Sequence, residues 1–281
     1  MHDMSTLTFA GLVALSSIAA GLIGALTGLG GGVILVPLLT LGFGVNVRYA
    51  AGASLISVIA TSSGAAASYV RDGFANMRVG MLLEVATTIG AVGGAILAGY
   101  VSTGFIAIVF GVVLLYSAFR ASVQTTDGTA GGPPDAIATK FRLDGALPTP
   151  NGPQPYTVSH VPLGFGLMGL AGVLSGLLGV GSGAVKVLAM DRAMRLPFKV
   201  STTTSNFMIG VTAAASAGIY LRRGYIDPLL ASPVMLGALI GALVGARLLR
   251  KAEVPLLRRV FSVVIAALAV EMIIKGLRGT L

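Results

Sequence analysis

The sequence contains Gly28-Leu29-Gly30-Gly31-Gly32 and, 151 residues later, Gly179-Val180-Gly181-Ser182-Gly183. Glycine is less favourable than alanine in a helix interior by about 1 kcal/mol per residue. Each glycine cluster is therefore expected to interrupt a helix inside a long apolar stretch. An interrupted backbone at membrane depth leaves N–H and C=O groups that are tolerated only against protein or in a wet cavity.

The match between the two clusters extends along the chain at the same offset. It continues without a gap over about 75 residues and includes residue types that chance rarely aligns in an apolar chain. The matched pairs include Gly21 with Gly172, Ser54 with Ser205, Thr61 with Thr212, Tyr69 with Tyr220 and Arg71 with Arg222. The sequence therefore predicts an internal repeat, which is the building plan of many transporters.

The composition indicates a membrane protein. Of 281 residues, 55% are hydrophobic and 10% are charged, whereas soluble chains carry about 25% charged residues. The net charge of +9 comes from basic residues in short runs between apolar stretches, which is typical of membrane loops and does not favour nucleic-acid binding. Because the chain has no cysteine, disulfides, thiolate metal sites and mechanisms through reactive cysteines are excluded.

The apolar stretches predict an all-α, polytopic membrane protein with two inverted repeats of about five hydrophobic segments each. A bilayer core needs about 20 apolar residues per helix. Long stretches lie near 7–27, 49–70, 79–99, 103–120, 161–179, 200–221, 229–249 and 256–276, and short ones near 32–43 and 183–191 follow the glycine clusters. The first stretch has no basic segment before it and is interpreted as a retained helix rather than a signal peptide.

Three parts of the chain are expected: an N-terminal transmembrane repeat at 1–120, an inter-repeat loop at 121–160 and a C-terminal transmembrane repeat at 161–281. The loop is rich in Pro, Gly, Thr and Asp, and we expect it to be polar and flexible, with room for a local hairpin.

The basic residues also predict how the two repeats are oriented. If each half has five segments and the amino terminus is outside, the inside loops hold 13 Lys and Arg residues and the outside loops hold 5, with Lys186 set aside. With four crossings per half, the division is 9 against 9. Cytoplasmic loops normally carry the excess, so we expect inverted repeats, with the amino terminus outside and the 121–160 loop cytoplasmic.

The helix that restarts after each cluster presents its first amides at the positive end of its dipole, which favours binding of an anion. Polar side chains follow on the next helix, where hydroxyls can donate hydrogen bonds to an oxyanion. The expected substrate-binding residues are Gly28, Gly30, Gly31, Gly32, Ser54, Thr61, Gly179, Gly181, Ser182, Gly183, Lys186, Thr204, Ser205 and Asn206.

Each of these residues also has a structural interpretation. The glycines could allow close helix packing, which is our expectation for Gly90, Gly93, Gly94, Gly241 and Gly245. The hydroxyls could bond between or within helices. Lys186 could balance a substrate's charge or extend to the interface. We place Glu84 and Glu271 at interfaces near their helix ends, so a dedicated proton relay is not evident from the sequence.

At these residues the chain resembles the sulfite exporter TauE/SafE family. The resemblance rests on the first cluster followed by Pro37, on the second cluster, and on Thr204-Ser205-Asn206-Phe207-Met208-Ile209-Gly210-Val211-Thr212. It covers nearly the whole chain outside 121–160 and implies export of sulfite or a related sulfur anion. The chain departs from the pattern at Ser182, which replaces a glycine, and at Leu188, the counterpart of Pro37.

The leading hypothesis is a carrier of a small sulfur oxyanion working by alternating access, with the lipid bilayer and the anion as its partners. A passive anion channel and a carrier of a non-sulfur anion stay open as alternatives. An intramembrane enzyme would need Ser182 and Lys186 as nucleophile and base, and we expect no catalytic residues, no metal and no cofactor. The sequence does not indicate the oligomeric state.

Overall fold

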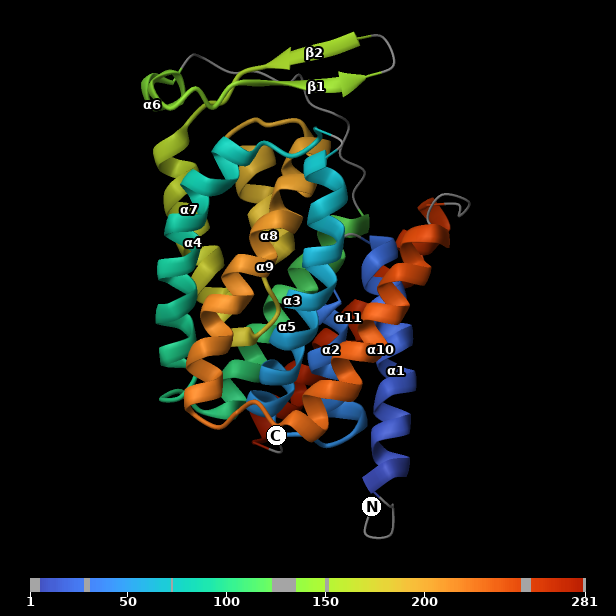
Figure 1. Cartoon of the computed structure of the whole chain (residues 1–281). Helices are drawn as coiled ribbons and strands as arrows, with labels where there is room; N and C mark the ends of the chain where they lie inside the picture. The colour runs from blue at the N-terminus through green and yellow to red at the C-terminus, as the bar shows by residue number, and fades with distance from the viewer. Residues whose placement is uncertain are drawn as a thin grey trace.

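The computed structural model describes residues 6–27, 31–71, 73–122, 135–149, 152–248 and 254–279. Helices account for most of them (Figure 1). The N-terminal half contains α1 (Thr6–Thr27), α2 (Gly32–Pro37), the π-helical turn η1 (Leu38–Gly42), α3 (Val47–Arg71), α4 (Met77–Leu97) and α5 (Thr103–Ser122). The C-terminal half contains α7 (Val161–Leu178), α8 (Gly183–Leu188), the π-helical turn η2 (Ala189–Ala193), α9 (Phe198–Arg222), α10 (Pro228–Leu248) and α11 (Val254–Arg278).

The apolar stretches predicted from the sequence are all helical, so the expected all-α membrane class is confirmed. Within the described residues, four helices are long and apolar enough to cross a bilayer by themselves. They are the helical segments Leu7–Gly24, Met77–Leu97, Val161–Leu178 and Pro228–Gly245. Large apolar side chains such as Leu15, Ile89 and Leu229 lie exposed on the outside of these helices, where lipid is the fitting solvent for them.

Four consecutive elements have the same boundaries in the two halves. The bounds of α2, η1, α3 and α4 recur as those of α8, η2, α9 and α10 with every terminus displaced by 151 residues. A π-helical turn is rare, yet one follows the short helix in both halves. Because Leu188 stands where the first half has Pro37, the proline is not required for this turn.

The helix contacts are also mirrored between the halves. Helix α1 packs against α10, and its counterpart α7 packs against α4, the counterpart of α10. Likewise α3 packs against α10 and α9 against α4, while the pairs α3–α9 and α5–α11 each join an element to its own counterpart. The halves therefore interlock, with helices of each half packed on helices of the other.

Glycines make these contacts close. A Cβ atom on Gly90 would lie 2.2 Å from the Gly169 carbonyl oxygen, and one on Gly94 or Gly241 would meet a backbone oxygen at 2.1 or 2.0 Å. The packing role expected for these three glycines is confirmed. The expectation is wrong for Gly93, where an added Cβ meets nothing within 4 Å.

A small cap of α6 (Ala136–Lys140), β1 (Gly145–Thr149) and β2 (Gly152–Tyr156) covers one end of the helices (Figure 1). The strands pair antiparallel, with Gly145 opposite Tyr156, so the hairpin expected in the inter-repeat segment is present. Helix α1 begins at the opposite end of the molecule, whereas α7 begins directly beneath this cap (Figure 1).

Asn76 attaches the cap to the helices. Its side-chain nitrogen donates to the Leu143 carbonyl at 2.7 Å and to the Tyr156 hydroxyl at 2.9 Å. Its side-chain oxygen accepts from the Val79 N–H at 3.1 Å and so caps α4. Burial raises the pKa of the Tyr156 hydroxyl above its ordinary value, which keeps that hydroxyl neutral as a hydrogen-bond partner.

Candidate functional site

The second glycine cluster forms a non-helical turn between α7 and α8, as the sequence predicts. Gly179, Gly181 and Ser182 have φ angles of +70°, +74° and +42°, a region that glycine adopts freely and other residues rarely. A Cβ on Gly179 would lie 2.6 Å from the Ala51 Cα, and one on Gly181 would lie 2.8 Å from the Ile209 side chain. The turn is therefore held between α3 and α9, and positions 179 and 181 have no room for a side chain.

The first cluster is described only in part, because Gly28 and Gly30 lie outside the described residues. Gly31 has right-handed helical angles and precedes α2, unlike its left-handed counterpart Ser182. Despite this difference in backbone conformation, α2 and α8 start at equivalent residues. The departure from the family pattern at Ser182 thus coincides with a local difference in backbone conformation.

The two clusters meet inside the molecule. A Cβ on Gly32 would lie 2.8 Å from the Ser54 hydroxyl, 2.9 Å from the Val58 side chain and 3.2 Å from the Val180 Cα. Val180 belongs to the turn of the other half, so the start of α2 touches the turn before α8. The structure thus brings residues of both predicted clusters together beside α3.

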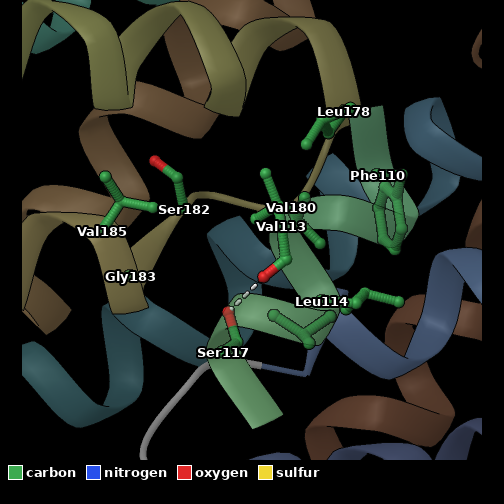
Figure 2. Close-up of a pocket in the computed structure, with 10 residues that line it drawn as sticks. Phe110, Val113, Leu114, Ser117, Leu178, Val180, Ser182, Gly183 and Val185 are labelled. Carbon is green, nitrogen blue, oxygen red and sulfur yellow. Dashed lines mark hydrogen bonds between the residues drawn. The ribbon is translucent and has the colours of Figure 1, made fainter. Parts of the chain in front are cut away.

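A small pocket lies next to this contact (Figure 2). Its walls come from α2, α5 and the turn around α8, and are mostly apolar. Its lining residues include Val33, Phe110, Ser117, Val180, Ser182 and Gly183. The pocket volume of about 20 Å³ accommodates about one water-sized group.

Two hydroxyls near the contact have no hydrogen-bond partner within the described part of the chain. They belong to Ser54 and Ser57, both fully buried on α3. A buried polar group without a partner costs about 1–3 kcal/mol, and such groups are rare enough to need an explanation. Because the Ser54 oxygen faces Gly32, an anion at the contact between the clusters is a suitable acceptor for its proton.

Lys186 lies on α8, one helical turn after Ser182, and its side chain is 0% exposed. Its ammonium group donates to the Thr212 hydroxyl of α9 at 2.5 Å. The Thr212 hydroxyl in turn lies 2.7 Å from a carboxylate oxygen of Glu84 on α4. Three elements thus join a buried cation to a buried carboxylate through one hydroxyl, and Lys186 does not extend to the interface.

The interfacial position expected for Glu84 is wrong. Glu84 is 8% exposed because α7 and α9 pack over this part of α4. The hydroxyls of Thr87 and Thr88 also donate to its carboxylate, at 3.0 and 3.2 Å. The sequence signal that could have identified it is a lone carboxylate followed by two threonines in an apolar helix, since ionisable residues inside the membrane are by default functional candidates.

Three other predicted site residues, Thr61, Thr204 and Ser205, form hydrogen bonds with protein groups. Thr61 donates to the carbonyl of Ser57 in its own helix at 3.0 Å, and Thr204 accepts from the Asn76 backbone N–H at 2.9 Å. Ser205 donates to the carbonyl of Gly183 at 3.3 Å, so it touches the start of α8. Asn206 is half-buried on the same helix.

The enzymatic alternative gains no support from the geometry. The Ser182 hydroxyl donates to the Ala171 carbonyl at 2.6 Å, while the Lys186 ammonium is bonded to Thr212. A nucleophile and its base must lie within hydrogen-bond reach of each other. Among the described residues, no group of three or more His, Cys, Asp or Glu side chains gathers to hold a metal ion. The arrangement offers hydroxyl donors, glycine amides and one buried cation, which suit a small anion.

The chain is similar to known membrane transporter proteins. The family model for sulfite exporter TauE/SafE matches residues 13–272. A probable membrane transporter protein, YunE of Bacillus subtilis (strain 168), is 25% identical over 96% of this chain and 99% of its own length. YdhB of the same organism, also a probable membrane transporter protein, is 27% identical over 84% of this chain and 89% of its own. A probable membrane transporter protein of Xylella fastidiosa (strain 9a5c) is 24% identical over 91% and 92%. No solved structure matches.

Proposed function

Because the chain belongs to the sulfite exporter TauE/SafE family, a family of membrane transporters, we propose that it exports a small sulfur oxyanion. The substrate is sulfite or a related organosulfonate, and transport proceeds by alternating access between two inverted repeats in the cell inner membrane. The substrate site is the contact between the two glycine clusters, together with Ser54 and Lys186.

One observation carries this proposal. The Ser54 hydroxyl is buried without a partner in the described part of the chain, and it faces Gly32 where the N-terminal half touches Val180 of the C-terminal half. A hydroxyl proton and nearby glycine amides can donate hydrogen bonds to an oxyanion. A site at the contact between repeats is also where transporters of this construction place their substrate.

The shared boundaries support the repeat, and the direction of the helices supports its inversion. Helix α1 starts at the end of the molecule away from the cap, and its counterpart α7 starts beneath the cap (Figure 1). The mirrored packing of α1 on α10 and α7 on α4 is the pattern that a two-fold axis produces. With the N-terminal end outside, the 121–160 segment lies in the cytoplasm, in agreement with the distribution of basic residues.

The close contact between the repeats at the proposed site favours a carrier over a passive channel. A channel conducts through a continuous path of weak sites, whereas the described residues of the two clusters touch each other at this site. A carrier closes around its site in each half-cycle and admits substrate only when the repeats move apart. The tight approach of Gly32 to Val180 is the contact that such a movement opens.

The test is anion counterflow in proteoliposomes. Vesicles loaded with unlabelled sulfite under anaerobic conditions should accumulate labelled external sulfite transiently, and the uptake should saturate. Sulfate, nitrate and acetate as internal anions measure selectivity. Flux that does not saturate and is not stimulated by internal sulfite would indicate a channel. Stimulation by nitrate or acetate equal to that by sulfite would overturn the assignment to sulfur oxyanions.

A further inference from the structure

The buried cluster of Lys186, Thr212 and Glu84 is more than the proposed anion site requires. Lys186 alone supplies a positive charge, yet the structure places a carboxylate within one hydroxyl of it. The described side chains of Lys186 and Glu84 form no direct ion pair within 4.0 Å, and the Thr212 hydroxyl bridges them. A carboxylate beside an anion site repels the substrate unless its own charge can be removed.

The cluster is confined to one of two equivalent places in the fold. The residues 151 positions away from Lys186, Thr212 and Glu84 are Leu35, Thr61 and Met235. Leu35 is fully buried in the core, and the helices around these positions have the same boundaries in both halves. The fold is therefore built equally well with apolar residues there, which argues against a purely structural role for the two charges.

The Lys186 ammonium group can donate to further acceptors. An ammonium group has three N–H donors, and the structure gives this one a single acceptor among the described residues, Thr212. Glu84 depends on hydroxyls from Thr87, Thr88 and Thr212 and on the nearby ammonium. The hydroxyls can serve a carboxylate or a carboxylic acid, since a hydroxyl both donates and accepts.

Among the described elements that pack around Glu84, Lys186 supplies the cation beside its carboxylate. Helix α7 has no titratable residue between Val161 and Leu178. On α9, Lys199 and Arg222 lie at the two helix ends, and the Tyr220 hydroxyl donates to carbonyls at the end of α7.

On α4 itself, Arg78 donates to the Arg142 carbonyl in the cap. In η2, which follows α8, Asp191 and Arg192 form an ion pair at 3.5 Å. Neither arginine therefore takes the place of Lys186 beside the Glu84 carboxylate.

We propose that Glu84 is a proton-binding site coupled to anion binding at Lys186, so that one proton moves with each anion. The inference rests on the proposed transport function and names its coupling ion. An anion that accepts from the Lys186 ammonium competes with Glu84 for that charge. The carboxylate then takes one proton from solution as an O–H bond, remains hydrogen-bonded to the threonine hydroxyls, and returns the proton when the anion leaves.

The sign of the coupling follows from linkage. If anion binding favours protonation, protonation favours anion binding by the same factor. A doubly charged anion with one proton still carries one net negative charge. An inside-negative potential therefore still drives its export.

The test is calorimetric titration of the purified protein with thiosulfate, which stays fully ionised across pH 5.5–8.5, in buffers of differing ionisation enthalpy. The dependence of the heat on the buffer gives the number of protons taken up per bound anion. For the wild-type chain we expect uptake approaching one proton. The dissociation constant should rise up to tenfold per pH unit where Glu84 is ionised in the free protein.

The Glu84→Gln variant keeps the hydrogen-bonding shape of the side chain and should take up no proton, with pH-independent affinity. The matched control is Glu271→Gln, which removes an exposed carboxylate paired with Lys275 on α11 and should behave as the wild type. If Glu84→Gln does not fold, Glu84→Asp should retain proton uptake, and the wild-type proton count tests the inference without any variant.

The outcomes separate the inference from the proposed function. Thiosulfate binding without proton uptake in the wild type would overturn the proton site and leave the anion transporter standing. Full proton uptake in Glu84→Gln would also overturn it. Absence of both thiosulfate and sulfite binding at every pH would overturn the anion site itself, and the coupling with it.

Discussion

At the scale of the residue, Ser54 combines complete burial with a hydroxyl that has no acceptor in the described part of the chain. The Ser54→Ala variant should be as stable as the wild type or more stable by about 1 kcal/mol, because it removes an unsatisfied group. Its affinity for sulfite should fall about tenfold or more, because a hydrogen bond to a charged group is worth about 1.5–3 kcal/mol. Thermal unfolding with and without sulfite measures both effects.

The matched control for Ser54 is Ser17→Ala. Ser17 is equally buried and has no partner among the described residues, but it lies on α1 against Gly237 of α10. Its removal should leave stabilisation by sulfite unchanged. Equal loss of that stabilisation in both variants would show that Ser54 has no specific role at the site.

The environment of some single residues could not be predicted from the sequence. Lys186 was identified because a cation in an apolar stretch is conspicuous. Glu84 was assigned to the interface because it lies only a few residues into its apolar stretch. Its burial depends on α7 and α9, which are remote in sequence, and on Thr212, 128 residues away. Such a partnership has no local signal, whereas a glycine turn is determined by its own residues.

At the scale of the element, the contact between α4 and α7 depends on backbones that approach without side chains between them. The Gly90→Ala variant places a Cβ 2.2 Å from the Gly169 carbonyl oxygen and should destabilise the protein by about 1–3 kcal/mol through overpacking. Gly93→Ala on the same helix meets nothing within 4 Å and should not lower stability. The unfolding midpoints in detergent compare them, and equal midpoints would contradict the close packing of α4 on α7.

The cap depends on Asp135, whose two carboxylate oxygens accept from the N–H groups of Ile137 and Val161, each at 2.8 Å. The bond from Val161 is the main cause that lowers the pKa of Asp135 below its ordinary value. A carboxyl whose pKa is lower in the folded state stabilises that state above its unfolded pKa of about 3.9. That contribution is lost as the pH falls through the folded-state pKa.

Asp135→Ala should therefore cost about 1 kcal/mol at pH 7, the usual cost of losing a helix cap. The difference from the wild type should shrink at pH 3, because there the carboxyl is mostly protonated in the unfolded state, whose pKa is about 3.9. Unfolding midpoints at the two pH values measure this, with Gln154→Ala, an exposed position in the same cap, as the control. A difference that stays constant between pH 7 and pH 3 would mean that the carboxylate charge does not stabilise the cap.

The elements themselves were the most predictable part of the chain. A helix that crosses a bilayer needs about 20 apolar residues, and this requirement gave the position of every long helix. The glycine clusters gave the short helices. The π-helical turns η1 and η2 could not be predicted, because no residue shared by the two turns specifies them. The details of the packing between α3 and α9 likewise depend on contacts between distant segments.

At the scale of the whole molecule, the distribution of basic residues predicts which end of the protein faces the cytoplasm. Gln154 lies exposed on β2 of the cap, and Tyr100, which is 80% exposed, follows α4. Helix α4 runs from the cap toward the other end of the molecule (Figure 1). Because the chain has no cysteine, a maleimide that cannot cross membranes labels only an introduced cysteine. In intact cells it should label the Tyr100→Cys variant and should label Gln154→Cys only after permeabilisation.

The reason for this expectation is the distribution of charge. The cap end of the helix bundle carries most of the basic loop residues, and such loops stay in the cytoplasm. Labelling of Gln154→Cys but not Tyr100→Cys in intact cells would show the opposite orientation and contradict a cytoplasmic cap. Labelling of both variants from the same side would contradict a spanning arrangement of α4, because its two ends would then share one compartment. The native chain without cysteine is the control and should remain unlabelled before and after permeabilisation.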